Sequence, residues 1–206
     1  MSFTFIIGAI VAYLLGSIPS GLWVGQYFFK KDIRQYGSGN LGSTNAFRVL
    51  GKKAGSLVLF CDIFKGFLAM ILALTIFKQP DISPLWIASF AVIGHTFPIF
   101  ASFKGGKAVA TFAGMILAYQ PLLLLYGLII FLILLAITRM VSLTAMVTIT
   151  LGVFLSLLFN DWTLTLFVLA IDIFIIYRHR SNIQRILNGT ENKVPMPWEQ
   201  KNKDTK

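Results

Sequence analysis

Long apolar runs constrain this chain more than any other feature of its sequence. About 20 helical residues cross the hydrocarbon core of a bilayer, and four runs reach or approach that length. They cover residues 3–29, 54–77, 122–138 and 141–159. Their number and length predict an all-α protein that crosses a membrane several times.

Three further runs are less regular. Residues 162–177 are continuous but somewhat short, and residues 85–101 are interrupted by His95 and Pro98. Residues 108–119 are too short to cross a bilayer upright, which favours a tilted or half-buried helix. With these runs included, we expect seven transmembrane helices, one or two of them short or tilted.

Composition agrees with a membrane protein. Apolar residues make up 56% of the 206 residues and charged residues only 13%, too few for a soluble domain of this length. The first run lacks a basic segment before it and a small-residue cleavage site, so we interpret it as a retained span. We expect a single domain over residues 1–190 and a short cytoplasmic tail over residues 191–206.

The basic residues predict the orientation. With the N-terminus outside, seven crossings place 16 of the 18 Lys and Arg residues on the inner side, leaving Lys78 outside and Lys65 within a span. Five crossings, with residues 85–119 as a re-entrant hairpin, give the same sidedness. The net charge of +10 therefore lies at the ends of apolar runs, which favours membrane lipids and anionic substrates over nucleic acid.

The first basic cluster contains a glycine-rich segment, residues 37–45, which we call the first glycine loop. Its glycines fit a dinucleotide-binding pattern, but no buried strand precedes them and Asp62, the acidic residue at the required spacing, lies inside a span. We expect a nest of backbone amides that holds phosphate instead. The alternative is a flexible loop whose cations touch lipid headgroups. The candidate residues are Gly37, Ser38, Gly39, Asn40, Thr44, Asn45 and, just beyond the loop, Arg48.

The second basic cluster, which we call the second glycine loop, is Lys104-Gly105-Gly106-Lys107. It is not a nucleotide-binding P-loop, because that motif needs a glycine where Ala101 stands and a hydroxyl where Ala108 stands. The expected helix from Ala108 would place a positive helix end beside the loop, so an anion site of backbone amides and lysines is predicted. His95, nearby, either bonds a neighbouring helix, which we favour, or takes part in chemistry.

The third cluster follows the last span. On a continuing helix, Arg178, His179 and Asn182 would share one face and line a headgroup-level cavity. The alternative is an ordinary basic collar at the interface. Within the spans, Asp62 and Lys65 are three residues apart and should neutralise each other as a structural pair. Asp172 needs a partner, either Lys65 or a hydroxyl.

These motifs, in this order, resemble the bacterial acyl-phosphate:glycerol-3-phosphate acyltransferases (the PlsY family). The matching segments span nearly the whole chain, with small departures at Ser43 and Ala108. They are Gly16-Ser17-Ile18-Pro19-Ser20 and residues 37–48, 62–66, 94–111 and 177–191.

The resemblance implies a seven-helix enzyme of the bacterial inner membrane with its active site facing the cytoplasm. It would transfer a fatty acyl group from acyl phosphate to glycerol 3-phosphate, releasing lysophosphatidate and phosphate, without cofactor, metal or CoA. The enzyme that makes acyl phosphate is a candidate partner. By position, Ser38, Arg48, His179 and Asn182 become catalytic, residues 104–107 bind glycerol 3-phosphate, and Glu191 is structural.

The expected chemistry suits such a donor. Acyl phosphate is a mixed anhydride with a good leaving group, so positioning and electrostatics can supply most of the catalysis. The His-x-x-x-x-Asp pair of thioester-dependent acyltransferases is absent after both His95 and His179. The proton from the attacking hydroxyl passes to the leaving phosphate, which we favour, or to His179. An anion transporter and a non-catalytic lipid-binding scaffold are the rival classes.

Overall fold

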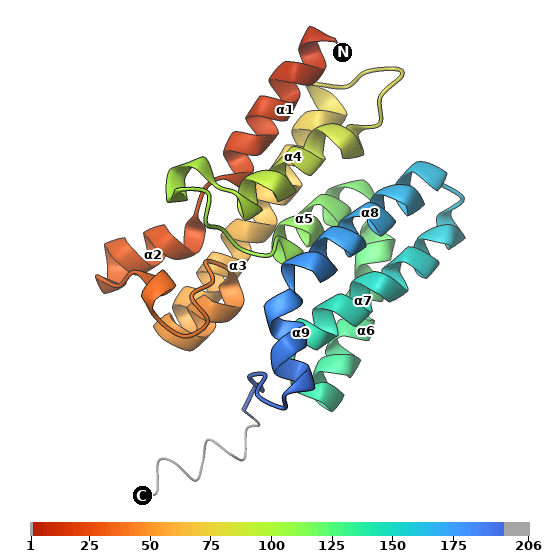
Figure 1. Ribbon diagram of the computed structural model, residues 1–206. Helices are drawn as coiled ribbons and strands as arrows, with labels where there is room; N and C mark the ends of the chain where they lie inside the picture. Colours follow the sequence, from red (N-terminus) through yellow and green to blue (C-terminus); the bar gives the residue numbers. More distant parts are fainter. Residues whose placement is uncertain (1, 196–206) are drawn as a thin grey trace, which may run out of the picture. The chain divides into compact units, whose positions relative to one another are not determined.

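Helices form the described part of the chain. The computed structural model describes residues 2–195, and its regular elements there are α-helices and short 3-10 turns (Figure 1). Contacts divide the chain into two compact units, residues 1–124 and residues 125–206. The single domain expected over residues 1–190 stays a prediction.

The first unit contains five helices and two 3-10 turns. They are α1 (Phe3–Gly16), α2 (Ser20–Phe29), η1 (Ile33–Gln35), α3 (Ser43–Thr75), α4 (Pro84–Thr96), η2 (Ile99–Ala101) and α5 (Val109–Tyr119). Prolines mark two of the helix boundaries, because proline lacks the N–H that a helix interior needs. Pro19 separates α1 from α2, and Pro98 follows the end of α4.

Glycines allow the helices of this unit to pack closely. A methyl group added at Gly66 of α3 would overlap the Thr111 carbonyl of α5, and one at Gly114 would overlap the Ile63 carbonyl. The pair α1 and α4 shows the same close approach at Gly16, which faces the Ala91 backbone. These contacts hold α5 against α3, and α4 against α1.

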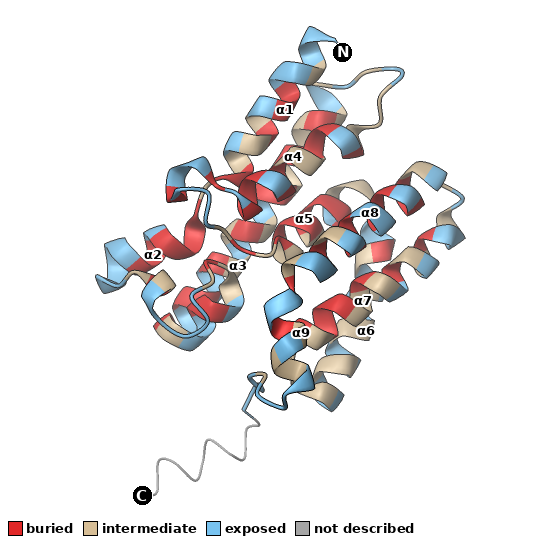
Figure 2. Cartoon of the chain, viewed as in Figure 1, coloured by how far each residue is buried: buried red, intermediate tan, exposed pale blue. Residues whose placement is uncertain are grey.

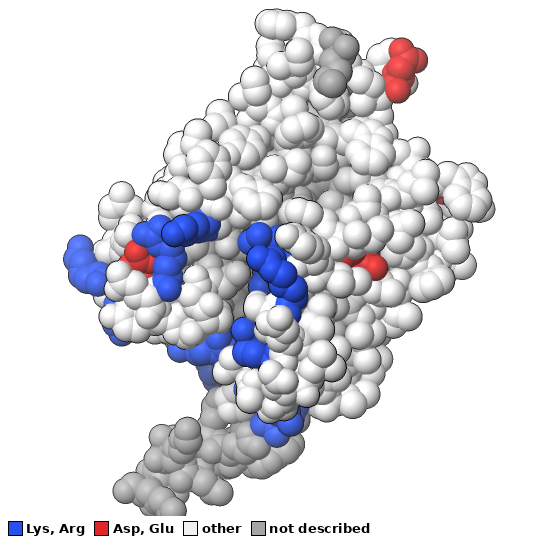
Figure 3. Space-filling model, in the orientation of Figure 1, with Lys and Arg blue, Asp and Glu red and all other residues white. Residues whose placement is uncertain are grey.

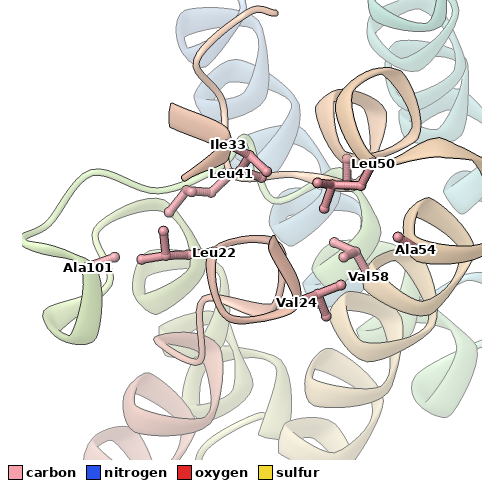
Figure 4. Packing of buried hydrophobic residues seen from close by; sticks show 9 residues of the cluster. Leu22, Val24, Ile33, Leu41, Leu50, Ala54, Val58 and Ala101 are labelled. Carbon is pink, nitrogen blue, oxygen red and sulfur yellow. The ribbon is translucent and has the colours of Figure 1, made fainter. Parts of the chain in front are cut away.

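A buried apolar cluster underlies the first glycine loop. Leu22 and Val24 of α2 pack with Ile33, Leu41 and residues of α3, as Figure 4 shows. Ile33 is fully buried although it lies in a short 3-10 turn. Burial of these apolar side chains therefore holds the loop in place. It contributes about 25 cal/mol of stabilising free energy for each Å² of apolar surface removed from water.

The second unit contains most of α6 (Pro121–Thr138), and then α7 (Val141–Ser156), η3 (Leu157–Phe159), α8 (Trp162–Arg178) and α9 (Arg180–Leu187). Asp172 of α8 accepts hydrogen bonds at 3.1 Å from the Thr150 hydroxyl of α7. Of the two partners that the sequence left open for this carboxylate, the structure shows the hydroxyl. The axes of α8 and α9 differ by 60°, so the continuing helix expected through His179 is wrong.

Five helical segments among the described residues are long and apolar enough to cross a membrane, or six if the bent pair α8–α9 is one span. The limits of four of these segments agree with the apolar runs to within a few residues, whereas α3 begins at Ser43, well before the run expected over residues 54–77. The helix α5 is the short one expected over residues 108–119. Leu123 is the one buried residue of α6, whose exposed and half-buried surface is visible in Figure 2. Such an apolar surface suits contact with lipid.

Candidate active site

The first glycine loop has a fixed shape. Gly37 and Gly39 have φ of 61° and 69°, the left-handed region that glycine adopts without strain. Asn45, 1% exposed, accepts a hydrogen bond from the Ser38 amide and donates to the carbonyls of Ile33 and Tyr36. Its side chain therefore supports the loop, and the phosphate contact predicted for Asn45 stays a prediction.

Two further observations define the exit from this loop. The Gly42 amide donates to the Asn40 side chain at 2.8 Å, and α3 begins at Ser43, as expected for a helix that starts near Thr44. Gly51, with φ of 84°, then interrupts α3. The helix segment of residues 43–50 is thus a separate short piece. It carries Arg48, which is exposed, as Ser38 and Thr44 are.

The second glycine loop uses its amides differently from the prediction. The Gly105 amide donates to the Thr96 carbonyl at 3.1 Å, and the Gly106 amide to the His95 carbonyl at 3.0 Å. The Lys104 amide donates to the Ala101 carbonyl at 3.2 Å. These three amides do not face an anion as predicted, because carbonyls at the end of α4 and in the turn after it accept their hydrogens. The lysine side chains remain as the cationic groups of this loop, beside the partial positive charge at the start of α5 at Val109.

A buried ion pair lies beneath both loops. Lys65 donates to Asp62 at 2.7 Å, which confirms the expected pairing, and also to the Ile18 carbonyl at 2.9 Å. Ser20 donates to the same Asp62 oxygen at 3.0 Å. The side chains of Lys65 and Asp62 are only 5% and 2% exposed, so these hydrogen bonds are needed to offset their desolvation.

The ion pair connects the two loops. His95 Nδ1 lies 3.6 Å from the same Asp62 oxygen. A small cavity, about the size of a water molecule, is lined by Asp62 and Lys65 together with Leu41 of the first loop and Gly106 of the second. Residues of two motifs some 60 residues apart in the sequence therefore line the same cavity as the buried ion pair.

In the second unit, His179 lies at the bend between α8 and α9 and is 3% exposed. Its Nδ1 is 2.8 Å from the Ile175 carbonyl. A carbonyl can only accept, so Nδ1 carries the proton and Nε2 holds the lone pair when the ring is neutral. This tautomer is the one that a base acting through Nε2 would need.

Glu191 joins several parts of the second unit. It accepts from Ser142 and Asn182 at 2.7 Å and from Arg185 at 2.8 Å. Burial by itself would raise the pKa of this carboxyl, but the three hydrogen bonds outweigh it and hold the pKa below its usual value. The ordered contacts thus continue beyond residue 190, where the sequence placed the start of the tail; the rest of that tail, residues 196–206, lies outside the described residues.

Sequence reasoning missed two hydroxyls of these networks. Ser20 bonds Asp62, and Ser142 bonds Glu191. Ser20 follows a proline inside an apolar run, and Ser142 stands three residues after Arg139; a polar residue at such a place is the signal that could have identified each.

Among residues 2–195, no three His, Cys, Asp or Glu side chains form a group able to hold a metal ion. The expectation of a metal-free enzyme stays a prediction.

Cations gather at one end of the first unit. On the face shown in Figure 3, blue atoms lie over α2, and none lies over the end where α1 begins. Exposed aromatic residues accompany them, since Tyr27 and Phe28 are 70% and 74% exposed beside Lys30 and Lys31. Aromatic and cationic side chains at the end of an apolar helix are typical of a membrane–water interface.

Comparisons with known proteins give the family. Residues 6–189 match the family described as glycerol-3-phosphate acyltransferase. Proteins of that name from Listeria welshimeri and Enterococcus faecalis are 51% and 54% identical to this chain, over 94% and 90% of it and 98% and 89% of themselves.

Solved structures agree. The crystal structure of PlsY (YgiH), an integral membrane glycerol 3-phosphate acyltransferase, in its glycerol 3-phosphate form, has a TM-score of 0.87 and 36% identity, covering 93% of this chain and 96% of that one. A second structure of it, in the lysophosphatidic acid form, has a TM-score of 0.83. PlsY (YgiH) is an integral membrane protein, and this chain belongs to the same family, the glycerol-3-phosphate acyltransferases.

Proposed function

We propose that this protein is an acyltransferase that moves a fatty acyl group from acyl phosphate to the primary hydroxyl of glycerol 3-phosphate. The products are 1-acyl-glycerol 3-phosphate (lysophosphatidate) and inorganic phosphate. The observation that carries the proposal is the small cavity that the buried ion pair lines together with one residue of each glycine loop, with the cations Arg48 and Lys104 of these motifs exposed. Family membership over residues 6–189 supplies the reaction class.

The chemistry that we infer is mostly electrostatic. Both reactants carry phosphate and repel each other, and Arg48, Lys104 and Lys107 offset that repulsion. Arg48 can hold two phosphate oxygens at once, and the lysines act as point charges. We assign to Ser38 the role of holding the donor phosphate or the oxyanion that develops on the acyl carbon.

The reaction forms one ester bond and breaks one anhydride bond. The hydroxyl oxygen of glycerol 3-phosphate bonds to the acyl carbon, and the bond from that carbon to the phosphate oxygen breaks. The proton passes to the leaving phosphate, which we favour because phosphate is basic enough to take it, or to Nε2 of His179. The hydrogen bond from His179 Nδ1 to the Ile175 carbonyl supports the second route. Asn182 acts beside His179, fixed by Glu191.

We also propose the membrane arrangement. Seven crossings, with α5 as the short one, put the N-terminus outside and the glycine loops and C-terminus in the cytoplasm of a bacterial cell. The excess of Lys and Arg between alternate spans supports this orientation.

One assay tests the reaction and its donor. The purified protein is incubated with palmitoyl phosphate and labelled glycerol 3-phosphate, without nucleotide, metal or CoA, and lysophosphatidate is measured. We expect product from the wild type and from Lys53→Ala, and at least a 100-fold loss in Arg48→Ala, which removes a charged contact. Lys53 is the matched control because it is also an exposed cation of α3. Product formed only with acyl-CoA would overturn the donor, and no product with either donor would overturn the reaction.

A further inference from the structure

His95 stands between the buried ion pair and the second glycine loop. It is 7% exposed and lies at the end of α4. On one side its Nδ1 is 3.6 Å from the Asp62 carboxylate. On the other side, its ring is the nearest neighbour of Gly106: the three atoms closest to a methyl group built there are Nε2, Cδ2 and Cε1 of His95, all close enough to overlap it. The imidazole therefore lies between Asp62 and the loop backbone.

The backbone of His95 contacts the same loop. Its carbonyl accepts from the Gly106 amide at 3.0 Å, and the neighbouring Thr96 carbonyl accepts from the Gly105 amide at 3.1 Å. Two main-chain hydrogen bonds and the edge of the imidazole that carries Nε2 thus meet the loop at Gly105 and Gly106. Lys104 and Lys107 flank the two glycines, so a shift of the glycines moves both cations.

The ion pair does not need His95 for its own neutrality. Asp62 is already paired with Lys65 and accepts from Ser20, and Lys65 also donates to the Ile18 carbonyl. A histidine that only filled the core could be replaced by an apolar residue at no cost in desolvation. The imidazole of His95 contacts the buried Asp62 carboxylate on one side and the backbone of the loop that carries Lys104 and Lys107 on the other. A side chain in this place can determine where the loop lies.

We propose that His95 is a positioning residue for the second glycine loop: its ring, fixed against Asp62, sets where Gly106 lies and so where Lys104 and Lys107 meet the phosphate of glycerol 3-phosphate. The inference rests on the proposed function for the identity of that phosphate. It assigns His95 no contact with substrate. It also explains why position 106 requires glycine on steric grounds, since Gly106 does not have a positive φ.

A double-mutant cycle tests the contact. His95→Ala should raise the KM for glycerol 3-phosphate about tenfold or more with a smaller change in kcat, and leave the KM for acyl phosphate unchanged, because only one substrate meets this loop. Gly106→Ala should have a similar effect, because its methyl group displaces the ring. In the double variant the methyl group occupies the space that the ring has left, so Gly106→Ala should cost much less than in the wild-type background.

Gly105→Ala is the matched control. Its methyl group would overlap the carbonyl oxygens of His95 and Thr96, which are main-chain atoms that His95→Ala leaves in place. Its cost should therefore be the same with and without the imidazole. If the costs of His95→Ala and Gly106→Ala simply add, or if both substrates lose affinity equally, the positioning role is wrong.

Thermal unfolding of the same variants makes the outcome independent of turnover. The contact predicts that Gly106→Ala lowers Tm in the wild-type background and much less in the His95→Ala background. If the effects of the two substitutions on Tm are coupled while neither the wild type nor any variant forms lysophosphatidate, the proposed function is rejected but the contact between His95 and Gly106 is supported. If His95→Ala does not fold, His95→Asn carries the cycle, since it keeps a polar group beside Asp62 but is shorter toward Gly106.

Discussion

The Glu191 carboxylate gives a test of a single side chain. Three donors hold its pKa below the usual value against the effect of burial. A carboxyl whose pKa is lower in the folded than in the unfolded protein stabilises the fold above the unfolded pKa, about 4.3, and this contribution is lost as pH falls through the folded value. We therefore expect Glu191→Gln to lower Tm at pH 7, and the difference from the wild type to disappear only at an acidic pH below the folded pKa.

Asp32 is the control for that experiment. Its pKa is also lowered, chiefly by the hydrogen bond from Arg34, but its partner is a neighbour in the sequence and the pair is partly exposed. Such exposed pairs contribute little to stability, so Asp32→Asn should change Tm only slightly at either pH. A Glu191→Gln variant whose loss of Tm is equally large at both pH values would show that shape, not charge, makes Glu191 important.

The packing of α3 against α5 gives a test of two helices. Gly66→Ala or Gly114→Ala would place a methyl group on a main-chain carbonyl of the other helix, so the helices must separate. Overpacking of this kind costs about 1–3 kcal/mol. We expect each variant to unfold at a lower temperature in detergent, and to lose affinity for glycerol 3-phosphate as well, because α5 follows the second glycine loop.

Gly152 of α7 provides the comparison. No atom lies within 4 Å of a methyl group added there, and alanine is the better helix former by about 1 kcal/mol. Gly152→Ala should therefore leave Tm unchanged or raise it. If Gly66→Ala is equally harmless, the close approach of α3 and α5 is incorrect.

Sidedness is a property of the whole molecule. In a background where Cys61, the only cysteine, is replaced by alanine, single cysteines are placed at Lys52, Lys104, Lys193 and Lys78. In sealed vesicles of known orientation, an impermeant maleimide should label the first three from the cytoplasmic face and Lys78→Cys from the other. Labelling of Lys104→Cys from outside would remove the second glycine loop from the cytoplasm and contradict the proposed orientation.

The helices of the molecule follow from the sequence largely because apolar length determines them. The limits of α6 and α7 match the apolar runs closely, and the pairing of Asp62 with Lys65 follows from a spacing of three residues on one helix. Features that neither apolar length nor helical spacing determines could not be predicted in this way. The bend at His179 is one example, and the use of the Gly105 and Gly106 amides by the end of α4 is another.

The hydrogen bonds of the second glycine loop have a consequence for recognition. With the amides of Lys104, Gly105 and Gly106 already satisfied by carbonyls of the same chain, the main chain of this loop is preorganised. It loses little conformational entropy when a solute arrives, and the cost of ordering falls on the lysine side chains alone. Replacing Lys104 or Lys107 by arginine should thus change which anionic solutes the loop prefers, while the turn keeps its conformation.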